Sequence, residues 1–352
     1  MGLSPDFWRG RRVLVTGHTG FKGCWLTLWL QRLGAEVTGL ALAPVGLDAG
    51  YRQLEPWCLA SHMVDLRDRS ALERTLRDAA PEIVFHLAAQ ALVRQGYADP
   101  VATYAINCQG TAHLFDAVRA AGSVRSMVVV TSDKVYANAE EGRPFVESDR
   151  LGGGDPYSNS KACVEVMTES WRRSFFDKAG LAVATARAGN VIGGGDNAAD
   201  RLLPDLNRAL ASNRPLLMRN PAATRPWQFV LEPLAGYIAL AEALTRRAPE
   251  APAAVNFGPG PEGDWTVRKV VETALRLIGR GSWEQDGDPG PHEAHYLSLD
   301  AGLARRSLGW QPLLSVETAI DWTVAWWRAA WEGASLRALA ERQLDSYTGL
   351  VQ

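Results

Sequence analysis

Short apolar runs alternate with longer helical stretches through the first half of this chain, and this alternation constrains the fold more than any other feature. The apolar runs that predict strands are residues 12–16, 36–40, 62–64, 83–87, 126–130 and 182–186. The stretches with helical character are residues 20–33, 71–79, 102–121 and 157–178. Most of the strand runs are continuously apolar, which indicates burial on both faces. The sequence therefore predicts an α/β fold, a doubly wound parallel sheet with helices on both sides.

The chain changes character after about residue 190. Proline and glycine become frequent there, as at residues 193–195, 258–263 and 286–291, and the alternation of strands and helices weakens. With 352 residues, the chain is long enough for two domains. We therefore expect a first domain at residues 1–190, to which segments near residues 228–257 return, and a smaller mixed C-terminal lobe at residues 191–352.

Composition argues against several classes of partner. The formal net charge is −2 and there is no basic stripe, so we expect no binding to nucleic acid. The four cysteines are scattered without the spacing of metal ligands, so we expect no metal and a reducing compartment. The chain has no apolar run long enough to span a membrane, and its first residues lack the apolar core of a signal peptide. These features favour a cytoplasmic protein that does not associate with membranes.

Three glycines follow the first predicted strand and open the first predicted helix. They are Gly17, Gly20 and Gly23 in the segment VTGHTGFKG. In a doubly wound sheet, the first glycine of such a loop permits a tight turn, the second lets the backbone approach a pyrophosphate, and the third lets helix and strand pack closely. The N-terminus of the helix then directs its positive end at the phosphates. The loop therefore predicts a dinucleotide cofactor.

The usual ribose ligand of such a cofactor is missing from its expected place. An acidic residue about 20 positions after the loop commonly binds the adenosine ribose, but residues 40–44 contain neither an acid nor an arginine for a 2′-phosphate. Asp65, followed by Leu66, is a candidate for contact with adenine. Asp65 is equally well explained as part of a helix N-cap region together with Asp68. This position therefore leaves NAD and NADP open.

A tyrosine and a lysine open the last long predicted helix of the first half. Tyr157 and Lys161 are four positions apart, so their side chains share one helix face. An ammonium beside a phenol favours the phenolate and lowers its pKa, which makes the tyrosine a usable base. Ser132 follows the preceding strand and is positioned to hold a substrate hydroxyl. The three residues predict a site that oxidises or reduces an alcohol.

These motifs resemble those of the extended short-chain dehydrogenase/reductase superfamily over nearly the whole chain. TGHTGFKG is similar to the TGxxGFxG loop of the superfamily, YSNSK to its YxxxK, HLAAQ to its fourth-strand motif and LGWQP to its C-terminal signature. Further segments narrow the likeness to the CDP-glucose 4,6-dehydratase family: AAQALVR, TSDKVY, DPYSNSK, RAGNVIGGGD, RPWQFVLEPL and PHEAHYL. An Asp-Lys pair directly after the active-site serine is typical of that branch.

The resemblance implies a Rossmann fold, tightly held NAD and conversion of CDP-glucose to CDP-4-keto-6-deoxyglucose, a step toward dideoxy sugars such as those of O-antigen. It also implies a homodimer or a higher homo-oligomer. The implied cofactor-binding residues are Gly17, His18, Gly20, Phe21, Lys22, Gly23, Asp65, Leu66, Ala88, Gln90, Asn107, Tyr157 and Lys161. The implied substrate-binding residues are Gln90, Arg94, Asn190, Arg201, Arg225 and His292.

A 4,6-dehydration needs two proton-transfer groups beyond the tyrosine. Oxidation at C4 acidifies the C5 proton, a base then removes this proton, an acid protonates the departing C6 hydroxyl, and hydride returns to C6. Asp133 and Lys134 directly follow Ser132, so we assign Asp133 as the acid and Lys134 as the base. A lysine serves as a base only if its pKa is depressed, for example by desolvation and nearby positive charge. In the alternative interpretation Asp133 is the working group, and Lys134 tunes it or holds a water molecule.

Three other functions remain open at this point. One is a nucleotide-sugar 4-epimerase or reductase, but an epimerase has no use for an acid at C6. Another is a dehydratase for a different nucleotide sugar. The last is a non-enzymatic NAD-binding protein on the same fold. Such a protein would be expected to lack Tyr157 or Lys161, and both are present.

Overall fold

A computed structural model describes residues 4–44, 50–54, 58–287 and 294–351. Its centre is a seven-stranded sheet with the order β10-β6-β5-β4-β1-β2-β3. The strands are β1 (Arg12–Thr16), β2 (Glu36–Ala41), β3 (Ala60–Met63), β4 (Ile83–His86), β5 (Ser126–Val130), β6 (Ala182–Ala188) and β10 (Ala254–Phe257). Every pair of neighbouring strands in this sheet is parallel. The predicted doubly wound fold is therefore confirmed.

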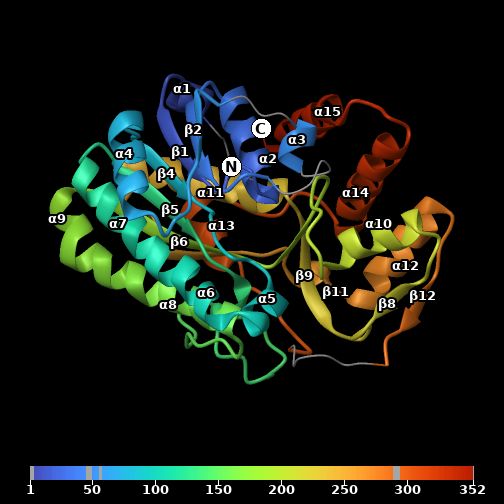
Figure 1. The fold of residues 1–352 in the computed structure, drawn as a ribbon. Coiled ribbons are helices and arrows are strands. Elements are labelled where there is room, and N and C mark those ends of the chain that lie inside the picture. The colour runs from blue at the N-terminus through green and yellow to red at the C-terminus, as the bar shows by residue number, and fades with distance from the viewer. Residues whose placement is uncertain (1–3, 45–49, 55–57, 288–293, 352) are drawn as a thin grey trace.

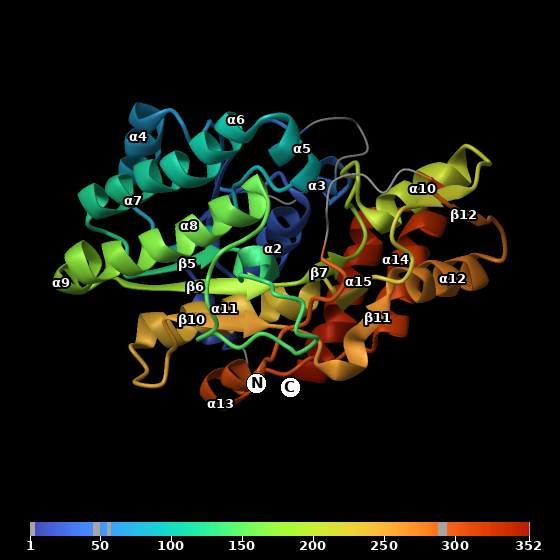
Figure 2. The same ribbon diagram turned by 90° about the horizontal axis from the view of Figure 1, so that it is seen from below.

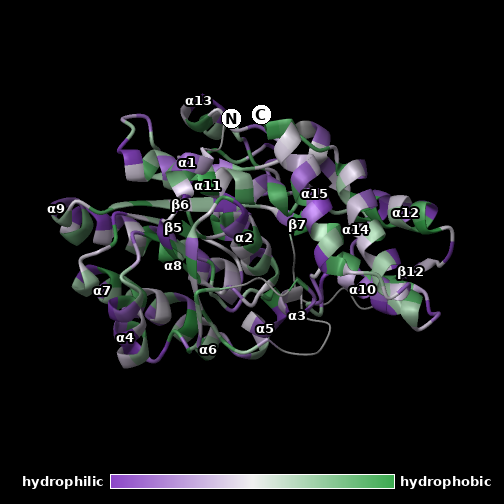
Figure 3. Ribbon diagram, turned by 90° about the horizontal axis from the view of Figure 1, so that it is seen from above, coloured by the Kyte–Doolittle hydropathy of each residue, from purple (hydrophilic) through white to green (hydrophobic). Residues whose placement is uncertain are grey.

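Helices cover both faces of the sheet. On one face lie α4 (Arg69–Ala79), α7 (Gly110–Ala121) and α8 (Pro156–Trp171), and on the other lie α2 (Phe21–Arg32) and α11 (Leu231–Arg246). Figure 2 shows α4, α7 and α8 on one side of β5 and β6, and α11 on the other. Purple and green stretches alternate along α4 and α7 in Figure 3, as expected for helices with one buried and one exposed face.

The alternation of side chains along each strand explains why the strand sequences are continuously apolar. Val13 and Val15 of β1 belong to the core beneath α2 and α11, whereas Leu14 between them belongs to the core beneath α4, α7 and α8. Successive side chains of a strand point to opposite faces. Because both faces are covered, every position of these strands favours an apolar residue.

The chain leaves the large sheet after β6 and builds a smaller lobe. There β7 (Asn190–Ile192), β9 (Thr224–Phe229) and β11 (Asp264–Thr266) form a three-stranded sheet in the order β11-β9-β7, and β8 (Leu216–Met218) pairs with β12 (Trp283–Gln285). The larger helices of the lobe are α10 (Leu202–Ala211), α12 (Val267–Ile278), α14 (Val316–Trp331) and α15 (Leu336–Val351). Figure 1 shows this lobe beside the sheet domain, with α5 (Val93–Ala98) and β9 near the junction. Through α11 and β10 the chain returns to the large sheet.

Several helices are shorter or more broken than the sequence suggested. The stretch 102–121 is divided into α6 (Pro100–Tyr104), a π-helical turn at Ala105–Gln109 and α7. The stretch 157–178 contains α8, a second π-helical turn at Arg172–Phe176 and α9 (Asp177–Ala179). The remaining short helices are α1 (Pro5–Trp8), α3 (Gly50–Leu54) and α13 (Gly302–Leu308). A π-helical turn is a local widening inside a helix, and the sequence pattern did not reveal these turns.

Candidate active site

A cavity of about 300 Å³ lies at the carboxyl ends of the sheet strands, between the sheet and the smaller lobe. Ligands bind at this edge in doubly wound folds. The predicted site residues that line it together are Lys22, Arg94, Ser132, Asp133, Lys134, Tyr157, Asn190, Arg201 and Arg225. The cavity is also lined by four residues that were not predicted from the sequence: Asp196, Asp200, Arg219 and Trp227. The smaller lobe supplies most of these missed residues, and the sequence pattern was least regular there.

The glycine loop has the geometry that a pyrophosphate requires. Gly17 has a φ of +77°, and a Cβ there would lie 2.8 Å from the backbone nitrogen of Ala88. A Cβ on Gly23 would lie 2.0 Å from the carbonyl oxygen of Gly17. No side chain caps the start of α2 at Gly20, so the first backbone N–H groups of the helix are available to an anion. The loop therefore fits a dinucleotide.

Two predicted cofactor residues have partners within the protein. His18 is fully buried, its Nε2 lies 2.7 Å from the hydroxyl of Ser61, and its ring occupies the space where a Cβ on Gly39 would lie. Burial lowers the pKa of His18 to about 4, which keeps the imidazole neutral. Asp65 forms an ion pair with Arg67 at 2.7 Å, and hydrogen bonding by Arg67 lowers the pKa of this carboxyl group. Asp68 caps α4 by accepting a hydrogen bond from the backbone of Ala71.

Gln90 and Asn107 support the loop after β4. The side chain of Asn107 accepts a hydrogen bond from the Gln90 backbone N–H at 2.8 Å and donates one to the Gln90 carbonyl at 3.0 Å. It also donates to the hydroxyl of Ser160. The Gln90 amide donates to Thr103 at 2.9 Å, away from the lining of the cavity. Asn107 lies in the first π-helical turn, which places it beside both Gln90 and α8.

The catalytic candidates Tyr157 and Lys161 lie on α8, where the helix begins beneath the cavity. Lys161 donates a hydrogen bond to the carbonyl of Val130 at 3.0 Å, and burial lowers its pKa to about 8. Burial raises the pKa of Tyr157 to about 12, and hydrogen bonding with Ser132 opposes the rise. The pKa of Tyr157 is therefore raised, whereas the spacing of Tyr157 and Lys161 predicted a lowered pKa, because desolvation of the phenolate is the largest effect.

The turn after β5 presents Ser132, Asp133 and Lys134 to the cavity. The Ser132 hydroxyl donates to Asp133 Oδ1 at 2.9 Å and accepts from the backbone N–H of Lys134 at 3.2 Å. Asp133 is only 3% exposed, and its Oδ2 has no hydrogen-bond partner among the described residues. Lys134 is half-buried at the cavity wall.

A buried ion pair holds both ends of this turn. Arg187 of β6 and Glu165 of α8 pair at 2.7 Å, with side chains 4% and 3% exposed. At one end of the turn, the Thr131 hydroxyl donates to Glu165. At the other end, Arg187 donates to the Tyr136 hydroxyl at 2.7 Å. Thr131 and Tyr136 are therefore both anchored, and the backbone of the turn that carries Asp133 is held between them.

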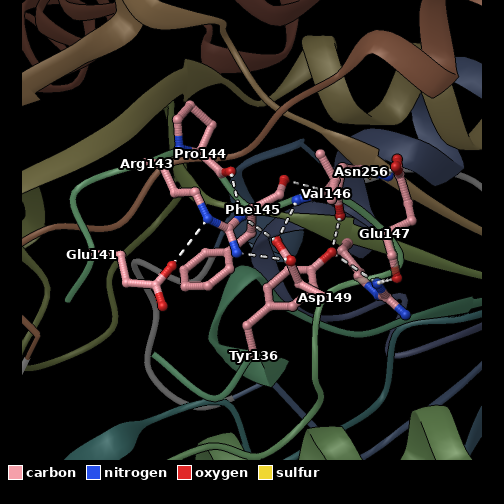
Figure 4. Close-up of polar contacts among 10 residues, drawn as sticks. Tyr136, Glu141, Arg143, Pro144, Phe145, Val146, Glu147, Asp149 and Asn256 are labelled. Carbon is pink, nitrogen blue, oxygen red and sulfur yellow. Dashed lines mark hydrogen bonds and ion pairs between the residues drawn. The ribbon is translucent and has the colours of Figure 1, made fainter. Parts of the chain in front are cut away.

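The Tyr136 end of the turn is covered by the loop before α8. The Tyr136 hydroxyl donates to the side chain of Asn256 at 2.7 Å, and its ring stacks on Phe145 with 4.7 Å between centroids. Asn256 in turn donates to the carbonyl of Phe145 and, through its backbone, to Glu147. Figure 4 shows Tyr136 with Phe145 and Asn256 in this group of contacts. The polar atoms of this buried cluster satisfy one another, as a rigid site requires.

The predicted substrate-binding arginines are each held by an acid or a carbonyl group. Arg201 pairs with Asp196 at 3.0 Å and Arg94 with Asp200 at 2.8 Å. Arg225 is almost fully buried and donates to the carbonyl of Thr224 at 2.9 Å. His292 lies outside the described residues. Fixed guanidinium groups around one cavity are suited to bind the phosphates of a nucleotide.

The described parts of the chain have neither a metal-binding cluster nor a membrane-spanning helix. They contain no group of three or more histidine, cysteine or acidic residues that could hold a metal ion. Within the same residues, no helix is both long and apolar enough to cross a membrane.

Comparison with known proteins gives a consistent family assignment. The model of the NAD dependent epimerase/dehydratase family matches residues 13–258. The CDP-glucose 4,6-dehydratase of Salmonella typhimurium is 43% identical over 352 residues, which cover 98% of each chain. The NAD complex of Thermus thermophilus UDP-glucose 4-epimerase shares 26% identity with a TM-score of 0.79, covering 91% of this chain and 99% of that one.

A solved dehydratase is also similar. The dTDP-glucose 4,6-dehydratase DesIV of Streptomyces venezuelae, a double mutant with NAD bound, shares 26% identity with a TM-score of 0.75, covering 91% of this chain and 98% of that one. The predicted family and the predicted cofactor are both confirmed by these comparisons. The chain belongs to the NAD-dependent epimerase/dehydratase family and, within it, to the family of the CDP-glucose 4,6-dehydratases.

Proposed function

We propose that this protein removes water from CDP-glucose to form CDP-4-keto-6-deoxyglucose. The relative that covers 98% of both chains carries the name of this activity. The observation that carries the proposal within the structure is Asp133, a buried carboxylate beside Ser132 in the cavity that Tyr157 also lines. Oxidation of an alcohol needs only the tyrosine and the serine, whereas loss of water needs additional proton-transfer groups.

The first half of the reaction uses Ser132, Tyr157 and Lys161. Ser132 holds the C4 hydroxyl, and Tyr157 removes its proton. Lys161 donates to the Val130 carbonyl, so its ammonium group is fixed at the end of β5, one helical turn from Tyr157 on α8. When bound, NAD supplies the hydride acceptor and later the donor, and the positive charge of its oxidised ring favours the phenolate.

The second half eliminates water across C5 and C6. Asp133 takes part directly, because its Oδ2 has no hydrogen-bond partner among the described residues and Asp133 lines the cavity. The sequence assigned Asp133 as acid and its neighbour Lys134 as base, and both residues line the cavity. Arg201 and Arg225 lie in the wall of the smaller lobe, where they are suited to bind the diphosphate of the nucleotide.

An epimerase is the runner-up, because solved 4-epimerases share this fold. An epimerase returns hydride to C4 and needs no proton transfer at C6. The buried Asp133 has no role in that chemistry, and for this reason we favour the dehydratase.

We further propose that the protein is a cytoplasmic homodimer that supplies deoxysugars for surface polysaccharides such as O-antigen. Val101 of α6 and Val166 of α8 are 78% and 60% exposed, respectively, and the two helices contact each other. Exposed aliphatic side chains on adjacent helices favour a contact between copies of the chain. Measurement of the mass in solution tests this proposal, and a monomer at micromolar concentration would contradict it.

Incubation with CDP-, dTDP-, UDP- and GDP-glucose tests the main proposal. We expect a 4-keto-6-deoxy product from CDP-glucose and little from the others, and we expect Tyr157→Phe to abolish it. Reaction only with another nucleotide would show that the substrate assignment is wrong while the mechanism stands. An isomeric sugar without loss of water would support the epimerase.

A further inference from the structure

The cavity contains a lysine that the proposed mechanism does not use. Lys22 is the second residue of α2, and its side chain reaches from the glycine loop into the cavity lining. Its Nζ lies 6.0 Å from the ring centroid of Tyr237, a fully buried residue. The amine therefore lies near the face of an aromatic ring, and Lys22 is part of the cavity lining.

The charged groups around Lys22 come from three different parts of the fold. Lys22 interacts electrostatically with Asp133 in the turn after β5, Lys161 of α8, and Asp196 and Arg201 in the segment before α10. Arg201 and Asp196 pair with each other at 3.0 Å, and Lys161 donates to the carbonyl of Val130. These contacts account for three of the five charged groups.

Lys22 and Asp133 are the two charged groups that do not take part in these contacts. Among the residues that the structure describes, no hydrogen bond or ion pair engages the Lys22 amine. The Oδ2 of Asp133 likewise has no partner within the described chain, although the residue is buried. A buried carboxylate without a partner is costly, and a cation and an anion that face one cavity are suited to bind a group between them.

We propose that Lys22 is a catalytic residue of the dehydration and acts with Asp133 on opposite ends of the C5–C6 bond. This inference rests on the proposed function and deepens it. It gives the second proton transfer to Lys22 rather than to Lys134, the sequence neighbour of Asp133. In this inference the carboxylate is the base and the ammonium is the acid, the reverse of the assignment made from the sequence.

The proton transfers balance as follows. After oxidation at C4, Asp133 takes the C5 proton, the C5–C6 double bond forms, and the C6–O bond breaks. The departing hydroxyl takes a proton from the Lys22 ammonium group and leaves as water. Hydride returns to C6 and Asp133 returns a proton to C5. Lys22 regains through solvent the proton that Tyr157 took from the C4 hydroxyl.

The environment of Lys22 suits this role. Burial lowers its pKa to about 8, Arg201 and Lys161 add to this lowering, and Asp133 opposes it. An ammonium with such a pKa is charged at neutral pH and is still a competent proton donor, since the best general acids have pKa values near the working pH.

Single-turnover reactions in deuterated water test the proposal. The variants are Lys22→Met, Lys22→Arg, Asp133→Asn and Lys134→Met, with Lys178→Met at the exposed α9 as the matched control. Four quantities are measured: bound NAD, absorbance of the reduced cofactor, deuterium at C5 of the 4-keto intermediate, and the 4-keto-6-deoxy product.

We expect Lys22→Met to keep NAD, to oxidise C4 and to exchange the C5 hydrogen, but to form product about 10²- to 10⁴-fold more slowly, the usual contribution of a general acid. Lys22→Arg should remain slow, because it keeps the charge but is a poor proton donor. Asp133→Asn should lose the C5 exchange. Lys134→Met should lose less activity than Lys22→Met, and Lys178→Met should behave as the unmodified enzyme.

Several results would overturn the inference. They are fast elimination by Lys22→Met or Lys22→Arg, loss of NAD or of C4 oxidation in Lys22→Met, C5 exchange that survives in Asp133→Asn, and a larger loss in Lys134→Met than in Lys22→Met. A failure of the unmodified enzyme to form a 4-keto product from any nucleotide hexose would instead overturn the proposed function.

Discussion

At the scale of single residues, two buried histidines connect the cofactor loop to the sheet and make stability depend on pH. His86 of β4 lies 2.7 Å from the Thr16 hydroxyl and 2.9 Å from the Thr111 hydroxyl, and burial lowers its pKa to about 3. Burial likewise lowers the pKa of His18 to about 4. In the unfolded chain the pKa of each histidine returns to about 6.5. Between the folded and unfolded pKa values, the unfolded chain therefore binds more protons than the folded protein. The folded state loses stability as pH falls below about 6.5.

We expect the free energy of unfolding to fall by up to about 1.4 kcal/mol per pH unit for each of these histidines between pH 6 and pH 4. Denaturant unfolding at several pH values measures this slope. His86→Gln should reduce the slope, whereas His295→Gln at an exposed position should leave it unchanged. A slope that is the same in His86→Gln and in the unmodified protein would contradict the assignment.

At the scale of elements, the Glu165–Arg187 pair couples α8 to β6. It also holds the turn after β5, which carries Ser132, Asp133 and Lys134. Glu165→Gln leaves the Arg187 guanidinium buried without a counter-charge, so we expect a loss of about 3–5 kcal/mol in the free energy of unfolding. We also expect a fall in kcat with little change in KM, because the turn residues are displaced while the arginines proposed to bind phosphate are not.

Glu73→Gln is the matched control for this change. Glu73 pairs with Arg69 on the surface of α4, and such exposed pairs contribute about 0.5 kcal/mol or less. Denaturant unfolding and steady-state kinetics of the two variants provide the comparison. Equal losses of stability in the two variants would show that the buried pair does not anchor the turn.

A second coupling of elements joins the C-terminal helices to the sheet domain. Glu232 of α11 accepts hydrogen bonds from the backbone N–H groups of Leu313 and Leu314 at 2.9 and 2.7 Å, and from the Tyr347 hydroxyl of α15 at 2.7 Å. We expect Glu232→Ala to destabilise the protein by about 1–3 kcal/mol for each buried N–H group left without a partner. Limited proteolysis should then cut near residues 313–314 first, and a cleavage pattern like that of the unmodified protein would contradict this prediction.

At the scale of the whole molecule, the sequence predicted the sheet well and the site in part. The apolar runs at 12–16, 83–87 and 126–130 became β1, β4 and β5 within a residue, because strands buried on both faces leave an unmistakable pattern. The glycine loop and Tyr157 were found in the same way, since their chemistry depends on residues that are close in the sequence. Each of these sequence signals lies within one short, continuous segment of the chain.

The partners that act across the fold were not predicted from the sequence. Glu165 meets Arg187 only because α8 packs beside β6, although Glu165 repeats the four-residue spacing of Tyr157 and Lys161, a signal that would have found it. Lys134 was chosen because it follows Asp133 in the chain, whereas the fold brings Lys22 to the same cavity from the distant glycine loop. Side-chain pairing of this kind depends on packing rather than on sequence spacing.

The fate of a deuterium label at C4 of the substrate tests the proposed dehydration most directly. The protein is incubated in ordinary water with CDP-glucose that carries deuterium at C4, and the product is analysed by NMR. We expect a 4-keto-6-deoxy product in which the deuterium has moved from C4 to C6. A product that retains deuterium at C4, with the configuration there inverted and the C6 hydroxyl intact, would contradict it.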